Sequence, residues 1–366
     1  MMNKYMDRLE SPAIVQIKKS ITEKQKDGVT VLDLTQAIVD ILPKLHYEEL
    51  TEHLGDIQTH LYTPDAGKDQ LREQLSLFFK KQWDYRAGPG NIFITPGANN
   101  AYFSLMIMLM NTGSRMLIPL PYYFNHSMTV DMLGGENVFC DFTYESIISN
   151  MADIDMITIV SPNNPSGKIL NSSHIEAIVR EAERQGKYVI IDETYALLRY
   201  GDNYSALSII DRYRNLFVVG SFSKSVPMAG WRLGYTVMHQ SFAEHFLKVM
   251  DCNVICASTV SQIALLDILS ALDKNAERVN EILIERRNAL IEYMDIEESD
   301  IPNAACFLWL PVDNDREFAS KLLDSHSIGV IAGSYFGKEG FVRISYGSTD
   351  TDNLRNAGRI IESMRN

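Results

Sequence analysis

Short apolar runs alternate with longer helical stretches over most of this 366-residue chain. The run 188–192 is apolar at successive positions before its final carboxylate, as expected for a parallel strand that is buried on both faces. Strands that alternate with helices are typical of an α/β protein with a largely parallel sheet. The predicted strands are 92–95, 116–120, 137–140, 156–160, 188–192, 216–219 and 235–238. Helices are predicted from the turn at 97–99 to about residue 109, and over 173–184.

The pattern changes after about residue 271. A long charged helix is predicted over 275–293, followed by strands near 306–310 and 341–346 and a final helix to residue 364. A chain of this length is expected to form two domains with a sizeable core. We therefore predict a large domain over 46–271 and a small domain built from both termini, 1–45 and 272–366.

Lys224 stands in the segment Ser221-Phe222-Ser223-Lys224, eight residues before Arg232. A lysine forms an imine with an aldehyde once its amine is uncharged, which a pocket that lowers its pKa achieves. Two serine hydroxyls and a planar guanidinium are groups that bind a phosphate monoester. An aldehyde and a phosphate together indicate pyridoxal 5'-phosphate (PLP) as the cofactor. The alternative for the same residues is a surface lysine and an arginine in a structural ion pair.

Asp192 ends the apolar run 188–192, and ligands of open α/β sheets bind at the carboxyl ends of strands. A carboxylate at this place can keep the pyridine nitrogen of PLP protonated. Tyr195, three residues after Asp192, could donate to the phenolate oxygen of the ring. The amide of Asn164 could donate to the same oxygen, because a rigid Asn164-Pro165 turn after the run 157–160 can direct it there. The alternatives are a plain turn for Asn164-Pro165 and a helix N-cap for Asp192.

Four motifs follow one another along the chain: NPSG at 164–167, DETY at 192–195, SFSK at 221–224 and GWRLGY at 230–235. In order and spacing they resemble the class I/II aminotransferases, the aspartate aminotransferase-like enzymes of fold-type I, and the resemblance extends from about Leu32 to Arg365. It implies an α/β fold with a mostly parallel seven-stranded sheet between helices, an antiparallel strand at 235–238, and a smaller α+β domain. It also implies a PLP-dependent homodimer that moves an amino group between an L-amino acid and a 2-oxo acid by a ping-pong mechanism.

The resemblance assigns further site residues. The turn at 97–99 would hold the phosphate at a helix N-terminus, and Tyr62 would reach the phosphate in the site of the partner subunit. Arg343 would clamp the substrate α-carboxylate, with Asn164 and Ala37 beside the substrate. The alternatives are core packing for Tyr123 and a structural ion pair for Arg343. The cofactor-binding set implied is Tyr62, Gly97, Ala98, Asn99, Tyr123 (stacked on the ring), Asn164, Asp192, Tyr195, Ser221, Ser223, Lys224 and Arg232, and the catalytic set is Lys224, Asp192 and Tyr195.

The chain departs from the family pattern at two places. In the segment 34–40, Ala37 stands where the family has glycine and Val39 where it has proline, so the pocket that this loop covers is expected to be unusual. Together with Ile38, this composition favours a neutral or apolar substrate side chain. His126 stands where a tyrosine is common and is either a proton carrier or a hydrogen-bonded wall of the pocket. The altered loop leaves open a PLP-dependent lyase or oxidase on the same scaffold, and a non-catalytic binding protein is a further alternative.

Charge and cysteine content exclude other classes of protein. The formal charge is −13, so binding to nucleic acid is not expected. Cys252 and Cys256 are four residues apart without matching histidines, so no metal site is expected, and the four cysteines are predicted to be buried free thiols of a reducing compartment. Acidic residues interrupt the N-terminal segment, and the apolar run 105–110 is too short to span a membrane. We therefore expect a cytoplasmic protein without a membrane partner.

Overall fold

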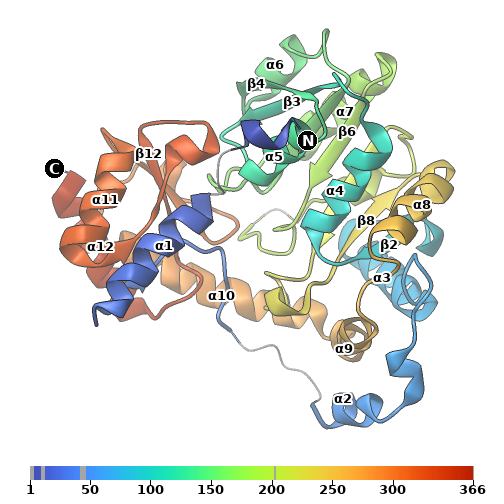
Figure 1. Cartoon of the computed structure of the whole chain (residues 1–366), viewed down its shortest axis with the longest axis horizontal. Coiled ribbons are helices and arrows are strands. Elements are labelled where there is room, and N and C mark those ends of the chain that lie inside the picture. The colour runs from blue at the N-terminus through green and yellow to red at the C-terminus, as the bar shows by residue number, and fades with distance from the viewer. Residues whose placement is uncertain (1–3, 10–12, 42–46, 202, 366) are drawn as a thin grey trace.

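The computed structural model describes residues 4–9, 13–41, 47–201 and 203–365. Its main sheet contains β2 (Ile92–Thr95), β3 (Arg115–Leu120), β4 (Glu136–Asp141), β5 (Met156–Val160), β6 (Tyr188–Asp192), β7 (Leu216–Ser221) and β8 (Gly234–Met238). Their order is β2-β8-β7-β6-β5-β3-β4, with β8 antiparallel to both of its neighbours and every other pair parallel (Figure 1). The seven predicted strands and the mostly parallel α/β sheet are confirmed, including the antiparallel strand.

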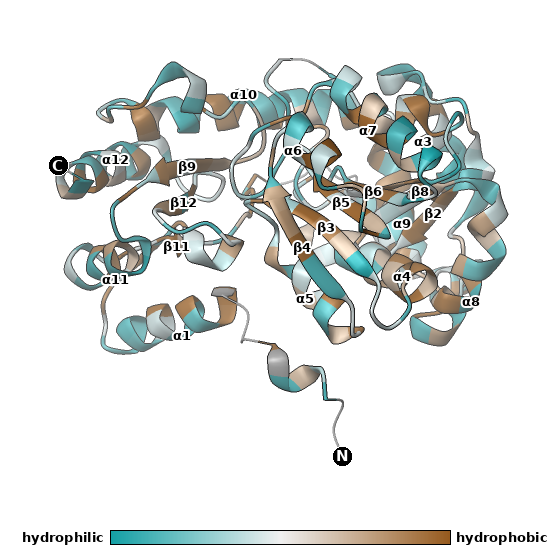
Figure 2. Ribbon diagram, turned by 90° about the horizontal axis from the view of Figure 1, so that it is seen from above, coloured by the Kyte–Doolittle hydropathy of each residue, from teal (hydrophilic) through white to brown (hydrophobic). Residues whose placement is uncertain are grey.

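Helices cover both faces of this sheet (Figure 2). In β6, Val189 and Ile191 belong to one apolar layer and Ile190 to the other, because successive side chains of a strand point to opposite faces. A strand with helices on both sides is apolar along its whole length, which is the pattern seen in the sequence. One layer includes α3 (Asp69–Trp83), α6 (Tyr144–Ser149), α7 (Ser172–Arg184) and α9 (Thr259–Leu269), and the other includes α4 (Ala98–Leu109), α5 (Phe124–Met132) and α8 (Ala243–Asn253).

A second apolar core joins residues from the two ends of the chain, such as Leu34, Leu283 and Ile344. Its strands are β9 (Phe307–Pro311), β11 (Ile331–Ala332) and β12 (Phe341–Ser345) in the antiparallel order β11-β12-β9, and β1 (Leu32–Asp33) paired in parallel with β10 (Ile328–Gly329). Its helices are α10 (Leu272–Ile291), α11 (Asp315–His326) and α12 (Thr351–Arg365). The domain limits at 45/46 and 271/272 stay predictions, and the first of them lies outside the described residues.

Helix α1 (Ala13–Lys26) lies beside the second core, whereas α2 (Tyr47–Leu54) lies at the opposite end of the molecule (Figure 1). Ile14 and Ile17, three residues apart on one face of α1, pack against the cluster of Trp309, Ile331 and Phe336. Lys18 pairs with Asp33 at the end of β1. One face of the N-terminal segment is therefore covered by its own chain.

All four cysteines are free thiols, and their burial differs from the prediction. Cys140 and Cys306 are buried, but Cys252 is exposed and Cys256 is half-buried. The prediction was wrong for Cys252 because the buried face of α8 is formed by Phe246 and Met250, and Cys252 lies off that face. In the part of the chain that the structure describes, no helix combines the length and the apolar character needed to cross a bilayer.

Candidate functional site

A cavity of about 370 Å³ opens at the carboxyl ends of the central strands. Val160, Asp192 and Ser221 are the last residues of β5, β6 and β7, and all three line it. Arg343, in β12 of the second core, lines the cavity too. Because ligands of open α/β sheets bind at this edge, the cavity between the two cores is the candidate site.

Lys224 lines the cavity three residues after the end of β7. Its ammonium nitrogen Nζ donates a hydrogen bond to the backbone carbonyl of Ala37. Burial lowers the pKa of Lys224 below its ordinary value of 10.5, and the positive charges of Arg343 and Arg232 act in the same direction. A lysine with a lowered pKa spends more time as the uncharged amine, which is the nucleophilic form.

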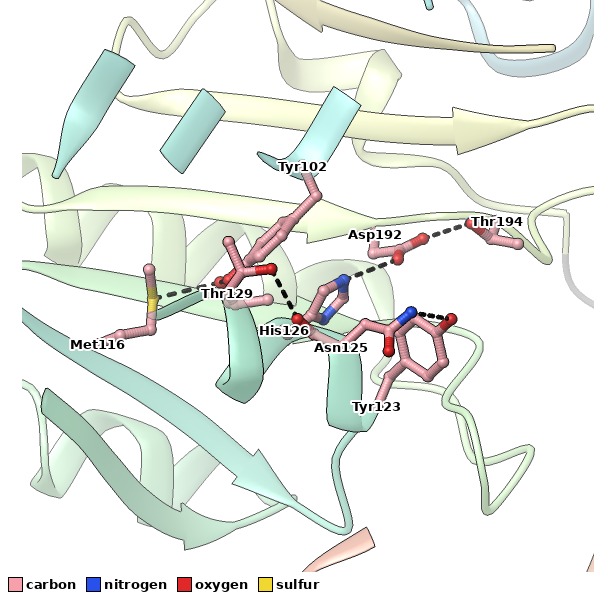
Figure 3. Close-up of polar contacts among 9 residues, drawn as sticks. Tyr102, Met116, Tyr123, Asn125, His126, Thr129, Asp192 and Thr194 are labelled. Atoms are coloured by element: carbon pink, nitrogen blue, oxygen red, sulfur yellow. Dashed lines mark hydrogen bonds and ion pairs between the residues drawn. The ribbon is translucent and has the colours of Figure 1, made fainter. Parts of the chain in front are cut away.

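Asp192 is held in place from two sides (Figure 3). Its Oδ1 accepts a hydrogen bond from the backbone N–H of Thr194 at 2.9 Å, and its Oδ2 lies 3.2 Å from Nε2 of His126. The residue is 4% exposed, and among the described residues it is the only acidic group that lines the cavity. A buried carboxylate in this position can hold a protonated nitrogen of a ligand ring.

His126 lies behind Asp192 (Figure 3). It is not among the residues that line the main cavity. Its ring centroid lies 4.0 Å from that of Tyr102 and 5.3 Å from that of Tyr123. The prediction of a pocket wall is therefore wrong for this cavity: the side chain at position 126 turns inward under Tyr123, onto the carboxylate. His126 instead lines a neighbouring cavity of about 320 Å³, where its Nδ1 has no hydrogen-bond partner among the described residues. A role in carrying protons stays a prediction.

The opposite end of the cavity is built for an anion. Gly97 is the N-cap of α4 with φ +83°, so the first turn of this helix directs its free N–H groups toward the cavity wall formed by Ala98 and Asn99. Arg232 approaches the turn, and within the described residues its guanidinium has a carbonyl partner, Ala229 at 2.7 Å, but no carboxylate. Ser221 and Ser223, whose hydroxyls lie 2.9 Å apart, line the same region.

If PLP binds at this turn as the sequence predicts, replacing Gly97 with alanine is expected to weaken its binding by at least about tenfold, which corresponds to roughly 1.4 kcal/mol. A Cβ at this position would lie 2.6 Å from Nη2 of Arg232, so the guanidinium would have to move. The measurement is a titration of the apoprotein with PLP, followed by absorbance. Gly113→Ala is the matched control, because Gly113 has φ +84° and nothing within 4 Å of the added Cβ. Equal affinities for the two variants would contradict the role of this close approach.

Arg343 is a buried cation with donors to spare. The side chain is 2% exposed, and the guanidinium lies over the rings of Phe307 and Phe336 at 4.7 Å and 5.0 Å. It donates to Oδ1 of Asn164 at 2.8 Å and to the carbonyl of Thr35, while its Nε has no partner among the described residues. Within the same residues no carboxylate pairs with it, so the predicted alternative of a structural ion pair is not seen. A buried arginine without an acidic partner is suited to bind the carboxylate of a ligand.

Two tyrosines, the buried Tyr195 and the half-buried Tyr123, complete the wall. Tyr195 packs edge-on against Phe307, at 5.3 Å between ring centroids, and burial raises its pKa well above 10.0, so its hydroxyl keeps its proton and can donate. Burial also raises the pKa of Tyr123, whose hydroxyl accepts a hydrogen bond from Nδ2 of Asn125 at 2.8 Å. Both side chains line the cavity and are more than packing residues of the core.

The structure brings nearly all the predicted residues to this one cavity. Those that line it are Ala37, Ala98, Asn99, Tyr123, Asn164, Asp192, Tyr195, Ser221, Ser223, Lys224, Arg232 and Arg343, and Gly97 adjoins it through Arg232. Tyr62 is not among them and is 78% exposed. Val39, predicted to influence the pocket, is 4% exposed and packs in the second core instead.

Sequence reasoning missed several residues of the cavity. Ile14 reaches it from α1, more than 300 residues away from Arg343 in the chain, and no local pattern indicates this. Phe124 and Thr194 also line it. Each lies next to a predicted residue, Tyr123 in one case and Tyr195 in the other, so adjacency to the motifs was the only available signal.

Comparison with known proteins gives one consistent family. The model of aminotransferase class I and II matches residues 29–361. A (5-formylfuran-3-yl)methyl phosphate transaminase of Methanocaldococcus jannaschii is 32% identical over 361 residues, which is 95% of each chain. An aspartate aminotransferase of Thermotoga maritima is 28% identical over 358 residues, which is 93% of each chain.

Solved structures agree with this. A Methanococcus jannaschii protein, whose active site is reported to be similar to those of kynurenine aminotransferases, superimposes with a TM-score of 0.91 at 27% identity over 100% of both chains. The crystal structure of the Thermotoga maritima aspartate aminotransferase has a TM-score of 0.90 at 24% identity, again over 100% of both chains, and shares the fold.

Proposed function

The chain belongs to the class I and II aminotransferase family and is an aminotransferase, and we propose that it uses PLP to move an amino group between an L-amino acid and a 2-oxo acid. One observation carries the proposal: a lysine with a lowered pKa, a buried carboxylate and two arginines without acidic partners among the described residues surround a single cavity. The predicted alternative of a lyase or oxidase is not favoured, because the relatives compared are named transaminases or aminotransferases.

The residues present fit PLP. Its phosphate would be held at the turn of Gly97 by Arg232, Ser221 and Ser223, where a Cβ on residue 97 would occupy the space that the guanidinium needs. Its pyridine nitrogen would meet Asp192, the acidic group that lines the cavity in the described part of the chain. The two groups lie at the ends of neighbouring strands, β6 and β7, as a single bound molecule requires.

When bound, PLP supplies an aldehyde that bonds to amines and a ring that accepts the electron pair released at the substrate Cα. Lys224 then acts through its Nζ, first as the anchoring amine and afterwards as the base that takes the Cα proton. Asp192 holds the proton on the ring nitrogen, and His126 behind it fixes the carboxylate. Tyr195 would donate a hydrogen bond from its hydroxyl to the phenolate oxygen of the ring. Its raised pKa keeps the hydroxyl protonated and therefore able to donate.

Arg343 determines how the substrate is oriented. A carboxylate that bonds to two nitrogens of its guanidinium would be held in the bidentate geometry that favours arginine over lysine. Asn164 bonds to the guanidinium, and Lys224 lines the same cavity as Arg343, so a substrate held by Arg343 would share that cavity with the Lys224 amine. Holding the reacting atoms in this way supplies much of the rate enhancement of such enzymes.

The test uses the PLP-loaded protein and a panel of L-amino acids in the absence of any acceptor. We expect the absorbance of the bound cofactor to shift to that of its aminated form while one equivalent of 2-oxo acid appears per site. Adding a different 2-oxo acid should restore the starting spectrum. Release of ammonia or hydrogen peroxide without the aminated cofactor would identify a lyase or an oxidase instead.

We propose in addition that the protein is a homodimer with shared sites, which the exposure of Tyr62 supports. Tyr62 is 78% exposed, and Leu61 and Ile57 shortly before it are 50% and 66% exposed, so three large exposed apolar side chains lie close together in the sequence. Exposed apolar patches of this kind mark contacts between proteins, and two-fold pairing is the commonest form of oligomer. A shared-site interface of this type exceeds about 2,000 Å² in total.

Mixing Tyr62→Phe with Lys224→Ala subunits is expected to raise activity above the average of the two parents. In the hybrid dimer, one site carries both lesions and the other carries neither, because Tyr62 serves the site of the partner subunit. The activity is measured after subunit exchange, and each variant mixed with itself is the control. A fully active monomer in sedimentation at micromolar concentration would rule out the shared site.

A further inference from the structure

The end of the cavity around Arg343 contains a subsite that the proposed mechanism leaves unused. If Arg343 binds the α-carboxylate and Lys224 meets the Cα, the substrate side chain must occupy the remaining space beside them. Ala37 marks this space, because its carbonyl accepts the hydrogen bond of Lys224 and the carbonyl of Thr35, two residues earlier, accepts one from Arg343. This inference rests on the proposed function and deepens it.

The walls of the subsite are apolar. The ring centroids of Phe124 and Phe336 lie 5.7 Å apart. The guanidinium carbon of Arg343 lies over the Phe336 ring, 5.0 Å from its centroid. Ile14 packs against the same cluster and lines the cavity. Gln36 and Ile38, on either side of Ala37, also line it, and Ile38 is 37% exposed, so the subsite remains accessible. The only polar side chain among these four lining residues is an uncharged amide.

All charged groups of the cavity already have a task. Among the described residues that line it, the cations are Lys224, Arg232 and Arg343 and the anion is Asp192. We propose that the side-chain subsite is neutral and apolar, so that the amino donor has an uncharged side chain of aromatic or branched aliphatic type, and that Ile38 is the residue that determines this specificity.

The physical reason is the cost of removing a charge from water. Within one subunit, a second carboxylate on the substrate would lie among Ile14, Ile38 and Phe124, and the amide of Gln36 is the only polar side chain of these four described lining residues. A buried charge without a partner is strongly unfavourable, whereas an apolar side chain gains free energy from the same burial. A cationic side chain is excluded by the same argument, since Asp192 is engaged by Thr194 and His126 at the end of β6.

Two unreactive carboxylates test the subsite directly by calorimetric binding to the PLP-loaded protein at constant ionic strength. 3-Phenylpropionate offers one carboxylate and an aromatic group, and succinate offers a second carboxylate in place of that group. We expect 3-phenylpropionate to bind at least about tenfold more tightly. Equal binding, or tighter binding of succinate, would overturn the proposal, whichever group supplied the additional contact.

The variant Ile38→Arg should reverse this preference by giving the second carboxylate a partner. The ratio of the two dissociation constants is expected to change by at least about tenfold in favour of succinate. Leu77→Arg is the matched control, because Leu77 is 61% exposed on α3, does not line the cavity, and receives the same change in charge. An equal change in both variants, or none in Ile38→Arg, would contradict the assignment of Ile38.

This test separates two kinds of failure. Binding of the carboxylates depends on Arg343 and the subsite and requires no turnover. If the protein aminates its cofactor with aspartate far more readily than with phenylalanine and also prefers succinate, the subsite is wrong and the aminotransferase mechanism stands. If no amino acid aminates the cofactor while 3-phenylpropionate binds tightly, the proposed function fails and the subsite stands.

Discussion

Lys224→Ala is expected to lower turnover by at least about 10²–10⁴-fold from the loss of proton transfer alone. The variant would also lose the amine that we propose anchors the cofactor covalently, so the true loss should exceed this range. The chemical test is reduction of the loaded wild-type protein with borohydride, followed by peptide mapping. We expect the pyridoxyl group on Lys224.

Lys187→Ala is the control for the lysine prediction. Lys187 also donates to a backbone carbonyl, that of Ala152 at 3.2 Å, but it is only half-buried and does not line the cavity. Its replacement should leave turnover unchanged. A pyridoxyl label on any lysine other than Lys224 would refute the assignment.

The same lysine should make cofactor capture depend on pH. Burial lowers the pKa of Lys224 below 10.5, with Arg343 and Arg232 contributing, so the uncharged amine forms at a lower pH than in an ordinary lysine. The rate of reaction of the apoprotein with PLP should therefore rise with pH and reach half of its maximum below pH 10.5. Arg343→Gln removes one of the neighbouring charges and should move this midpoint to higher pH, and a midpoint that stays in place would exclude the electrostatic contribution.

Asp192→Ala is expected to keep PLP binding but to lower kcat by about 10²–10³-fold, on the order of 3–4 kcal/mol of activation free energy. The reason is that the ring nitrogen loses the buried carboxylate that holds its proton. The measurements are PLP affinity by absorbance titration and kcat with a good amino donor. Asp192→Asn should show a similar loss with less disturbance of His126, whose Nε2 lies 3.2 Å from the carboxylate.

The control for this prediction is a carboxylate at the other end of the sheet. Asp155 precedes β5, and its Oδ2 accepts a hydrogen bond from the backbone N–H of Arg115 at 2.7 Å. Asp155→Ala should leave kcat near the wild-type value even if it lowers stability. A near-normal kcat for Asp192→Ala would show that the carboxylate does not serve the ring nitrogen.

The sequence by itself determined the sheet and the chemistry of the site. Runs such as 188–192 are short and continuously apolar, as is typical of a strand that is covered on both faces. The positions of the strands could therefore be predicted from the local pattern. Asp192 was found because it ends such a run, at the edge where parallel strands bring their carboxyl ends together. Lys224 was found because it follows two serine hydroxyls and stands eight residues before Arg232. These signals involve residues close together in the sequence, so they can be recognised without a structure.

Tertiary structure decided which residues surround that chemistry. Arg343 meets Thr35 across 308 positions of the chain, and Ile14 reaches the cavity from a helix that carries no motif. His126 lies behind Asp192 because α5 directs its side chain under Tyr123 and onto the carboxylate. No local pattern of the sequence specifies this direction. Such contacts depend on how the two cores pack against each other. That packing involves side chains from many segments at once, so no single segment of the sequence predicts it.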